Sequence, residues 1–142
     1  MLKLFIVDDS KLIVDRLVNL LSDVEGLRII GHANSAVVAK EYIRRSGPDF
    51  VILDIHLRDG NGIDLLKFIK MNTPLTEVMM LTNYPEEDYR KKCLELGAEY
   101  FLDKSIEFEK AILICRQSAK RSEQMKNEDA NSISNISPTK LN

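Results

Sequence analysis

Five short, mostly apolar runs alternate with amphipathic segments along this chain, and this alternation most limits the fold. The runs are residues 4–7, 27–33, 50–53, 78–81 and 100–102. Short apolar runs are typical of strands that are buried on both faces of a parallel sheet. The segments between the runs carry apolar residues at helical spacing, which predicts helices that cover the sheet. We therefore expect an α/β fold built on a doubly wound, five-stranded parallel sheet.

Residues that cap helices mark the ends of the predicted elements. Ser10 and Ser35 stand where helix N-caps are expected, and Gly97 stands where a helix should end. The inward stripe expected for the first helix is Ile13, Leu17, Leu20, Leu21 and Val24. With right-handed crossovers and five strands, we expect the flavodoxin-like strand order 2-1-3-4-5.

The length of 142 residues suits one domain with a short extension. From about Ser122 apolar residues become isolated and Asn, Ser, Lys and Glu dominate. Such a segment buries too little apolar surface to offset the entropy lost on ordering. We therefore predict a domain over residues 1–121 and a disordered C-terminal tail or linker over residues 122–142.

Charge and hydropathy exclude several classes of partner. The formal net charge is −2 and no basic stripe is present, so direct binding to nucleic acid is not expected. No apolar run approaches the roughly 20 residues that cross a bilayer, and the N-terminus does not resemble a signal peptide. We expect a cytoplasmic protein without a membrane partner. Cys93 and Cys115 form no metal-binding or redox motif and are predicted to be buried free thiols.

Polar residues stand directly after four of the five predicted strands. They are Asp8 and Asp9, Asp54, Thr82 and Lys104. Ligands of doubly wound sheets bind beyond the carboxyl ends of the strands, and strands one and three are neighbours in the expected order. The three carboxylates should therefore converge and repel one another. A hard divalent cation such as Mg²⁺ would relieve this repulsion.

The remaining groups complete the requirements of a phosphoryl site. Lys104 supplies a point charge and Thr82 a hydroxyl, and both can hold a phosphate oxygen. Asp54 ends a predicted central strand and can act as a carboxylate nucleophile. Taken singly, these residues also fit structural roles as helix-start acids, a turn threonine and a solvated lysine. Their occurrence at the same end of four strands favours the phosphoryl site.

The order and spacing of four motifs resemble a known family. The motifs are VDDSK, VILDIHLRDGNGIDLL, MLTN and YFLDKS. They resemble the receiver domain of two-component response regulators, and the resemblance covers about residues 3–121. It implies that Asp54 accepts a phosphoryl group from a histidine kinase or a phosphorelay protein. It also implies that Asp8, Asp9, Asp54 and the main-chain carbonyl of His56 hold Mg²⁺.

The resemblance further implies a conformational switch. Thr82 and Lys104 would assist phosphoryl transfer, and Thr82 and Phe101 would occupy the two switch positions. Phe101 is expected to turn inward from the surface after phosphorylation. A downstream protein target, or a second copy on phosphorylation, is expected to bind the face formed by the fourth helix, fifth strand and fifth helix. We expect a single-domain response regulator without an output domain in this chain.

Three residues depart from the pattern of the family. Arg58 and Ser105 stand where proline is usual, and Asn83 replaces a small residue after Thr82. The first change should loosen the loop after Asp54. The second leaves open whether the Lys104–Ser105 bond is cis, since a cis bond before a non-proline residue costs about 2.5–4 kcal/mol.

Two other functions use related residues. A phosphatase of the haloacid dehalogenase type also needs a strand-end Asp and Mg²⁺, but it requires a second acid where His56 stands. A non-phosphorylated interaction module on the same fold would not need the acids or Lys104. We therefore expect a phosphoacceptor switch that catalyses only its own phosphorylation and dephosphorylation, and not an enzyme.

Overall fold

The structure, a computed structural model, describes residues 1–134. Its main sheet contains β1 (Leu2–Val7), β2 (Leu27–Ala33), β3 (Phe50–Leu53), β6 (Glu77–Thr82) and β7 (Tyr100–Asp103). All neighbouring strands of this sheet are parallel, and their order is β2-β1-β3-β6-β7. Numbered along the chain, these five strands have the order 2-1-3-4-5, so the predicted fold class is confirmed.

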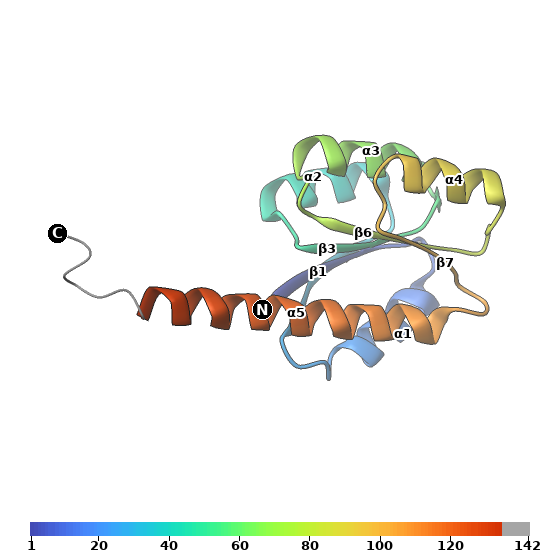
Figure 1. Cartoon of the computed structure of the whole chain (residues 1–142). Coiled ribbons are helices and arrows are strands. Elements are labelled where there is room, and N and C mark those ends of the chain that lie inside the picture. Colours follow the sequence, from blue (N-terminus) through green and yellow to red (C-terminus); the bar gives the residue numbers. More distant parts are fainter. Residues whose placement is uncertain (135–142) are drawn as a thin grey trace.

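Five helices cover the two faces of this sheet. They are α1 (Lys11–Leu21), α2 (Ala36–Ser46), α3 (Gly62–Asn72), α4 (Glu87–Glu95) and α5 (Phe108–Ser134). Helices α1 and α5 lie on one face, and α2, α3 and α4 lie on the other (Figure 1). This three-layer arrangement leaves the loops after the strands free to form a site at one edge of the sheet.

The alternation of side chains along each strand divides the core into two clusters. On β1, Leu4 and Ile6 pack with α1 and α5, whereas Phe5 and Val7 pack with α2, α3 and α4. Successive side chains of a strand point to opposite faces, so both faces of β1 must be apolar. This explains why the strand appears in the sequence as an unbroken apolar run.

The predicted caps are present in the structure. The hydroxyl of Ser10 accepts a hydrogen bond from the Ile13 amide at 3.3 Å, and the hydroxyl of Ser35 accepts one from the Val38 amide at 3.3 Å. Gly97 follows α4 with a φ of 104°, a conformation that favours glycine. Because Ser10 caps α1, the helix begins directly after Asp8 and Asp9. These two acids therefore lie at the carboxyl end of β1.

One residue of the predicted stripe on α1 lies elsewhere. The buried residues of α1 are Val14, Leu17 and Leu21, whereas Leu20 is 44% exposed. Residues 14, 17 and 21 share one side of the helix, and Leu20 stands at the edge of that side. The prediction that Leu20 faces the core is therefore wrong.

A small hairpin that we did not predict follows Asp54. Strand β4 (His56–Leu57) pairs in antiparallel fashion with β5 (Gly60–Asn61). At its tip, the Asp59 carboxylate accepts hydrogen bonds from the Ser35 hydroxyl at 2.8 Å and from the Ala36 amide at 2.6 Å. These bonds tie the loop to the start of α2 and lower the pKa of Asp59. They restrain the segment in which Arg58 replaces the usual proline.

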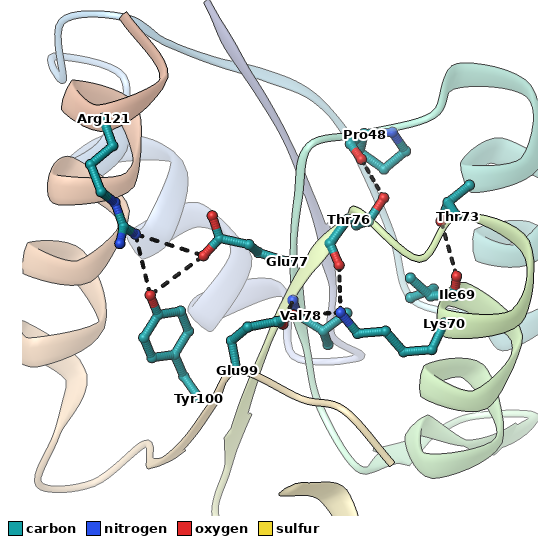
Figure 2. Close-up of polar contacts among 10 residues, drawn as sticks. All are labelled: Pro48, Ile69, Lys70, Thr73, Thr76, Glu77, Val78, Glu99, Tyr100 and Arg121. Carbon is teal, nitrogen blue, oxygen red and sulfur yellow. Dashed lines mark hydrogen bonds and ion pairs between the residues drawn. The ribbon is translucent and has the colours of Figure 1, made fainter. Parts of the chain in front are cut away.

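A polar network lies at the amino-terminal ends of β6 and β7, away from the residues that follow the strands (Figure 2). Glu99, just before β7, accepts a hydrogen bond from the Val78 amide at 2.6 Å and pairs with Lys70 of α3 at 2.5 Å. On α5, Arg121 lies 3.4 Å from the Tyr100 hydroxyl. The network links α3, β6, β7 and α5, and it thereby sets the relative positions of the strands whose far ends carry Thr82 and Lys104.

Helix α5 is longer than we predicted. It continues through Ser134, so the domain boundary that we predict at residue 121 falls inside this helix. Disorder of the residues after 121 in solution stays a prediction. Glu123 explains part of this extension, because its carboxylate lies 3.1 Å from the amino group of Met1 and its side chain packs over Gly26. The rest of the predicted tail, residues 135–142, lies outside the described residues. None of the helices within residues 1–134 has the length and apolar character needed to cross a membrane.

Removing the chain after Glu123 should lower the melting temperature by no more than a few degrees. The side chains of residues 124–131 are all exposed, so their loss removes little buried apolar surface. Thermal unfolding followed by circular dichroism will test this. Truncation after Gln117 provides the contrast, because it also removes the buried Ser118 and Ala119 and should destabilise the domain clearly. A comparably large loss from the shorter deletion would contradict the prediction.

Candidate functional site

Three charged side chains meet where β1, β3 and β7 end. The Lys104 ammonium lies 2.7 Å from Asp8 Oδ2 and 3.0 Å from Asp54 Oδ2, so it bridges the two carboxylates. Their other oxygens accept main-chain hydrogen bonds, with Asp8 Oδ1 bonded to the Ser10 amide and Asp54 Oδ1 to the Ile55 amide, both at 2.8 Å. The predicted convergence of these residues is therefore confirmed by their contacts.

These three side chains are buried, which is unusual for charged groups. Asp8, Asp54 and Lys104 are 3%, 6% and 7% exposed. Burial raises the pKa of Asp8, although hydrogen bonds from Lys104 and Ser10 act in the opposite direction. For Lys104, burial lowers the pKa, but the hydrogen bond to Asp8 and the charge of Asp54 outweigh it and the net direction is upward. Lys104 therefore remains a cation that can hold a second anionic group at this edge.

The acids suit a hard divalent cation. One carboxylate oxygen each from Asp8, Asp9 and Asp54 lies within 4.8 Å of the others, and Asp9 is exposed to solvent. Mg²⁺ prefers oxygen ligands and usually keeps several of its waters, so an open cluster of three carboxylates fits it. The residues present thus fit the ion that the sequence implied. When bound, Mg²⁺ would neutralise charge on a transferring phosphoryl group.

Thr82 lies at the end of β6, beside the strand that carries Asp103 and Lys104. Its side chain is fully buried, and its hydroxyl accepts a hydrogen bond from the Tyr84 amide at 2.9 Å. Its main-chain carbonyl accepts a hydrogen bond from the Lys104 amide at 2.9 Å. Backbone bonding therefore joins Thr82 to the lysine, and the hydroxyl still has its own proton to donate.

His56 does not join the carboxylates through its imidazole. Its ring packs edge-on against Tyr84, with 4.1 Å between ring centroids, and Tyr89 lies 6.0 Å away in the same manner. The three rings form an aromatic group in the segments that follow β3 and β6. His56 and Tyr84 each stand two residues after Asp54 and Thr82 in the sequence, but this spacing does not indicate the contact between their rings.

Gly62 is a residue of the site that sequence reasoning missed. It begins α3, and its amide donates a hydrogen bond to the Ile55 carbonyl at 2.6 Å. A Cβ atom at this position would lie 1.9 Å from the main-chain oxygen of Asp54. The close approach therefore requires glycine, and it fixes the backbone that carries the Asp54 carboxylate. The only signal in the sequence was the Gly-rich turn itself.

Phe101 occupies an inward position in this structure. It is 4% exposed, and the guanidinium of Arg90 on α4 lies 5.7 Å from its ring centroid. Arg90 also donates a hydrogen bond to the Phe101 carbonyl at 3.1 Å. We expected the Phe101 ring to start at the surface, and the structure differs. The ring packs into the core on the α4 side, and Arg90 covers it.

The peptide bond between Lys104 and Ser105 has the ordinary trans geometry. The described residues contain no cis peptide bond, so the Lys104–Ser105 bond is trans. Ser105 donates hydrogen bonds from its amide and its hydroxyl to Asp103 Oδ1, at 2.9 Å and 2.7 Å. These bonds hold the turn that positions the lysine.

The two thiols are buried as predicted, and burial raises the pKa of Cys93 to about 11 and that of Cys115 to about 12.

The residues of this site lie within a segment that matches a known protein family. A family sequence model described as the response regulator receiver domain matches residues 4–116. The chain belongs to the response regulator receiver family. Receiver domains are phosphoacceptor switches that bind Mg²⁺ at an acidic pocket and interact with histidine kinases or phosphotransfer proteins.

Individual relatives agree with this assignment. The DNA-binding transcriptional activator DevR/DosR of Mycobacterium tuberculosis is 32% identical over 106 residues, which are 75% of this chain and 49% of that protein. The CheX-CheY-BeF3-Mg+2 complex from Borrelia burgdorferi contains a chain 29% identical to this receiver, with a TM-score of 0.71 over 80% of this chain and 84% of that one.

A further neighbour supports the fold alone. It is the CheY-like receiver domain protein of Methanospirillum hungatei JF-1, with a TM-score of 0.74, 22% identity and coverage of 87% of this chain and 97% of that one. This receiver spans about half the length of the first curated relatives that it matches.

Proposed function

We propose that this receiver accepts a phosphoryl group on Asp54, with Mg²⁺ held by Asp8, Asp9, Asp54 and the main-chain carbonyl of His56. The observation that carries the proposal is the buried Lys104 ammonium, which bridges Asp8 and Asp54. A buried cation between two carboxylates is available to a phosphoryl oxygen once the metal neutralises the acids. The donor is a histidine kinase or a phosphotransfer protein, and the reaction takes place in the cytoplasm.

The chemical step moves the phosphoryl group from nitrogen to oxygen. An Asp54 carboxylate oxygen attacks phosphorus, the P–N bond of the donor phosphohistidine breaks, and its electron pair returns to the imidazole. Lys104 and the Thr82 hydroxyl hold the oxygens of the group as charge develops on them. The main-chain amide of Ile55 already orients the Asp54 carboxylate.

Labelling with acetyl phosphate tests this function directly. The wild-type chain should acquire one acid-stable but base-labile phosphoryl group in Mg²⁺, and none after treatment with EDTA. A non-phosphorylated interaction module would stay unlabelled under both conditions. A phosphatase of the haloacid dehalogenase type would instead release phosphate repeatedly from a generic phosphomonoester, and such turnover would overturn the proposal.

Tyr84→Ala should shorten the lifetime of the aspartyl phosphate severalfold. Tyr84 stands beside the site and is held against the His56 ring, so its bulk is expected to restrict the approach of water. The measurement is the decay of purified phosphorylated protein. Tyr84→Phe keeps the ring and should decay at the wild-type rate. An unchanged or longer lifetime for Tyr84→Ala would show that the ring does not restrict water.

We further propose that phosphorylation is transmitted through Thr82 and Phe101 to the face formed by α4, β7 and α5. A phosphoryl oxygen can attract the Thr82 hydroxyl as a charge-assisted donor, which would displace the Tyr84 amide that now bonds to it. Because Phe101 is already buried, the change expected there is a repacking of its ring and of the covering Arg90. A downstream protein target would bind this face, and a second copy is a possible occupant after phosphorylation.

Amide chemical shifts with beryllofluoride and Mg²⁺ should change from the Asp54 loop through Thr82 to Phe101 and Arg90. The physical reason is that Thr82 and Phe101 lie on the paired strands β6 and β7, and that Arg90 is hydrogen-bonded to Phe101. Asp54→Asn treated in the same way is the control and should show no such changes. Changes confined to the loops around Asp54 would contradict this account of signalling while leaving the phosphorylation site intact.

A further inference from the structure

The loop between β3 and α3 contains His56, whose main-chain carbonyl belongs to the proposed Mg²⁺ site. The base of this loop is fixed, because the Gly62 amide donates a hydrogen bond to the Ile55 carbonyl at 2.6 Å. Between these two residues the chain forms the small hairpin of β4 and β5, in which His56 begins the first strand. The direction of the His56 carbonyl therefore depends on what holds this hairpin in place.

The turn of the hairpin is not of the type that its length favours. Arg58 and Asp59 are the two residues between the paired strands. Two-residue hairpin loops usually adopt turns with a positive φ at one or both central residues, because these turns match the twist of the strands. Within residues 1–134, positive φ values occur only at glycines, so neither Arg58 nor Asp59 has one. A hairpin this short, with such a turn, needs support from outside its own strands.

Asp59 supplies this support through three hydrogen bonds to the start of α2. Its Oδ2 accepts one from the Ser35 hydroxyl at 2.8 Å and one from the Val37 amide at 3.2 Å. Its Oδ1 accepts the third from the Ala36 amide at 2.6 Å. The bonds from Ala36 and Ser35 lower the pKa of Asp59 and thus favour its charged form.

Helix α2 gains from the same contact. Its first turn contains no acidic residue of its own, although a negative charge is favourable at the N-terminus of a helix. The Asp59 carboxylate provides that charge from a segment 22 to 24 residues further along the chain. The anchor between the hairpin and α2 is therefore stabilised from both sides, by hydrogen bonds and by charge.

We propose that Asp59 is a positioning residue for the metal, which anchors the hairpin to α2 and thereby holds the His56 carbonyl toward Mg²⁺. This role rests on the proposed function, because it requires the Mg²⁺ site described above. Asp59 is not one of the acids whose oxygens converge at that site, so it acts through the backbone that it holds. The anchor takes the place of the restraint that a proline ring would give at Arg58.

Titration of the full chain with Mg²⁺, followed by amide chemical shifts, tests this role. Asp59→Ala should raise the dissociation constant for Mg²⁺ by about three- to tenfold, because the His56 carbonyl is no longer held in position before the ion binds. Labelling by acetyl phosphate should slow at limiting Mg²⁺ and recover at saturating Mg²⁺, since the reacting groups are unchanged. A general loss of structure would not be reversed by Mg²⁺ in this way.

Hydrogen exchange of the metal-free protein gives a second readout. In Asp59→Ala the amides of residues 55–61 should exchange faster than in the wild type, whereas those of β1 and β3 should not change. Asp49→Ala is the matched control, because Asp49 is also an exposed acid that accepts a main-chain hydrogen bond, from Lys3 at 2.8 Å, but it precedes β3. It should leave both the Mg²⁺ affinity and the exchange of the hairpin at the wild-type level.

Ser35→Ala shows whether Asp59 acts through α2. Alone, it should weaken Mg²⁺ binding less than Asp59→Ala does, because the two main-chain donors to Asp59 remain. In the Asp59→Ala background it should have no further effect on Mg²⁺ affinity, since the bond between the two side chains is already lost. Effects of the two changes that simply add would exclude the anchor to α2.

The outcomes distinguish this role from the proposed function. If the wild type is labelled and Asp59→Ala binds Mg²⁺ equally tightly, the positioning role is wrong and the phosphorylation of Asp54 stands. A labelling defect that persists at saturating Mg²⁺ would also contradict the role. A wild type that neither binds Mg²⁺ nor is labelled would overturn the proposed function and the positioning role together.

Discussion

Asp54→Asn should reduce Mg²⁺-dependent labelling by acetyl phosphate to background. The substitution keeps the size of the side chain and its capacity to accept a hydrogen bond from the Ile55 amide, but it removes the nucleophilic carboxylate. It also leaves Lys104 paired with Asp8 alone, so one of the two ion pairs of the ammonium is lost. Intact-mass spectrometry after labelling gives the fraction of phosphorylated protein for both proteins.

Asp49→Asn is the matched control for this variant. Asp49 lies at the opposite edge of the sheet, where its carboxylate accepts a hydrogen bond from the Lys3 amide at 2.8 Å. The same chemical change at this position should leave labelling at the wild-type level. If Asp54→Asn were labelled as fully as the wild type, the phosphoacceptor would be another residue, and the function proposed for Asp54 would be wrong.

The fold and the centre of the site were predictable because both follow from short-range rules. A strand buried on both faces must be apolar throughout, so β1, β3 and β6 are visible as runs in the sequence. Parallel strands end at the same edge, so the residues directly after them meet there. These two rules are sufficient to predict from the sequence that Asp8, Asp54 and Lys104 lie close together.

The features that escaped prediction depend on contacts between distant segments. The Asp59 carboxylate caps α2 from a hairpin that precedes α3, and nothing near Ser35 in the sequence indicates its partner. The extension of α5 is likewise associated with Glu123, which contacts Met1 and Gly26 at the other end of the chain. Composition alone predicts a disordered tail from residue 122. A segment of mostly polar residues can also form an exposed helix, and residues 122–134 do so.

The other error concerned the exposure of one side chain, Leu20, on the amphipathic helix α1. The spacing of Leu20 is compatible with the inward stripe of α1, yet the neighbouring α5 leaves this side of the helix open as one wall of a groove. A helical pattern shows which residues share a side, but it does not show how far the next helix covers that side. The exposed Leu12 and Leu113 could not be placed beside each other without the packing of α1 against α5.

Gly62→Ala should destabilise the protein by about 2–4 kcal/mol and sharply reduce labelling of Asp54. The added Cβ would lie 1.9 Å from the Asp54 main-chain oxygen and 2.9 Å from its carbonyl carbon. Both atoms belong to backbone, so no side-chain rotation can relieve the overlap. Either the start of α3 or the end of β3 must move, and movement of β3 displaces the carboxylate from Lys104. Urea unfolding and acetyl phosphate labelling measure the two effects.

Gly60→Ala is the control for this prediction, because it lies in the same loop. A Cβ atom there would lie 3.3 Å from Ala36 Cβ, a tight contact that a shift of a few tenths of an ångström relieves. Its effect on the free energy of unfolding should stay within about 1 kcal/mol. If Gly62→Ala unfolded at the same urea concentration as Gly60→Ala and was labelled equally well, the loop would tolerate a side chain at residue 62. The close approach of α3 to the Asp54 backbone would then not be what positions the proposed phosphoacceptor.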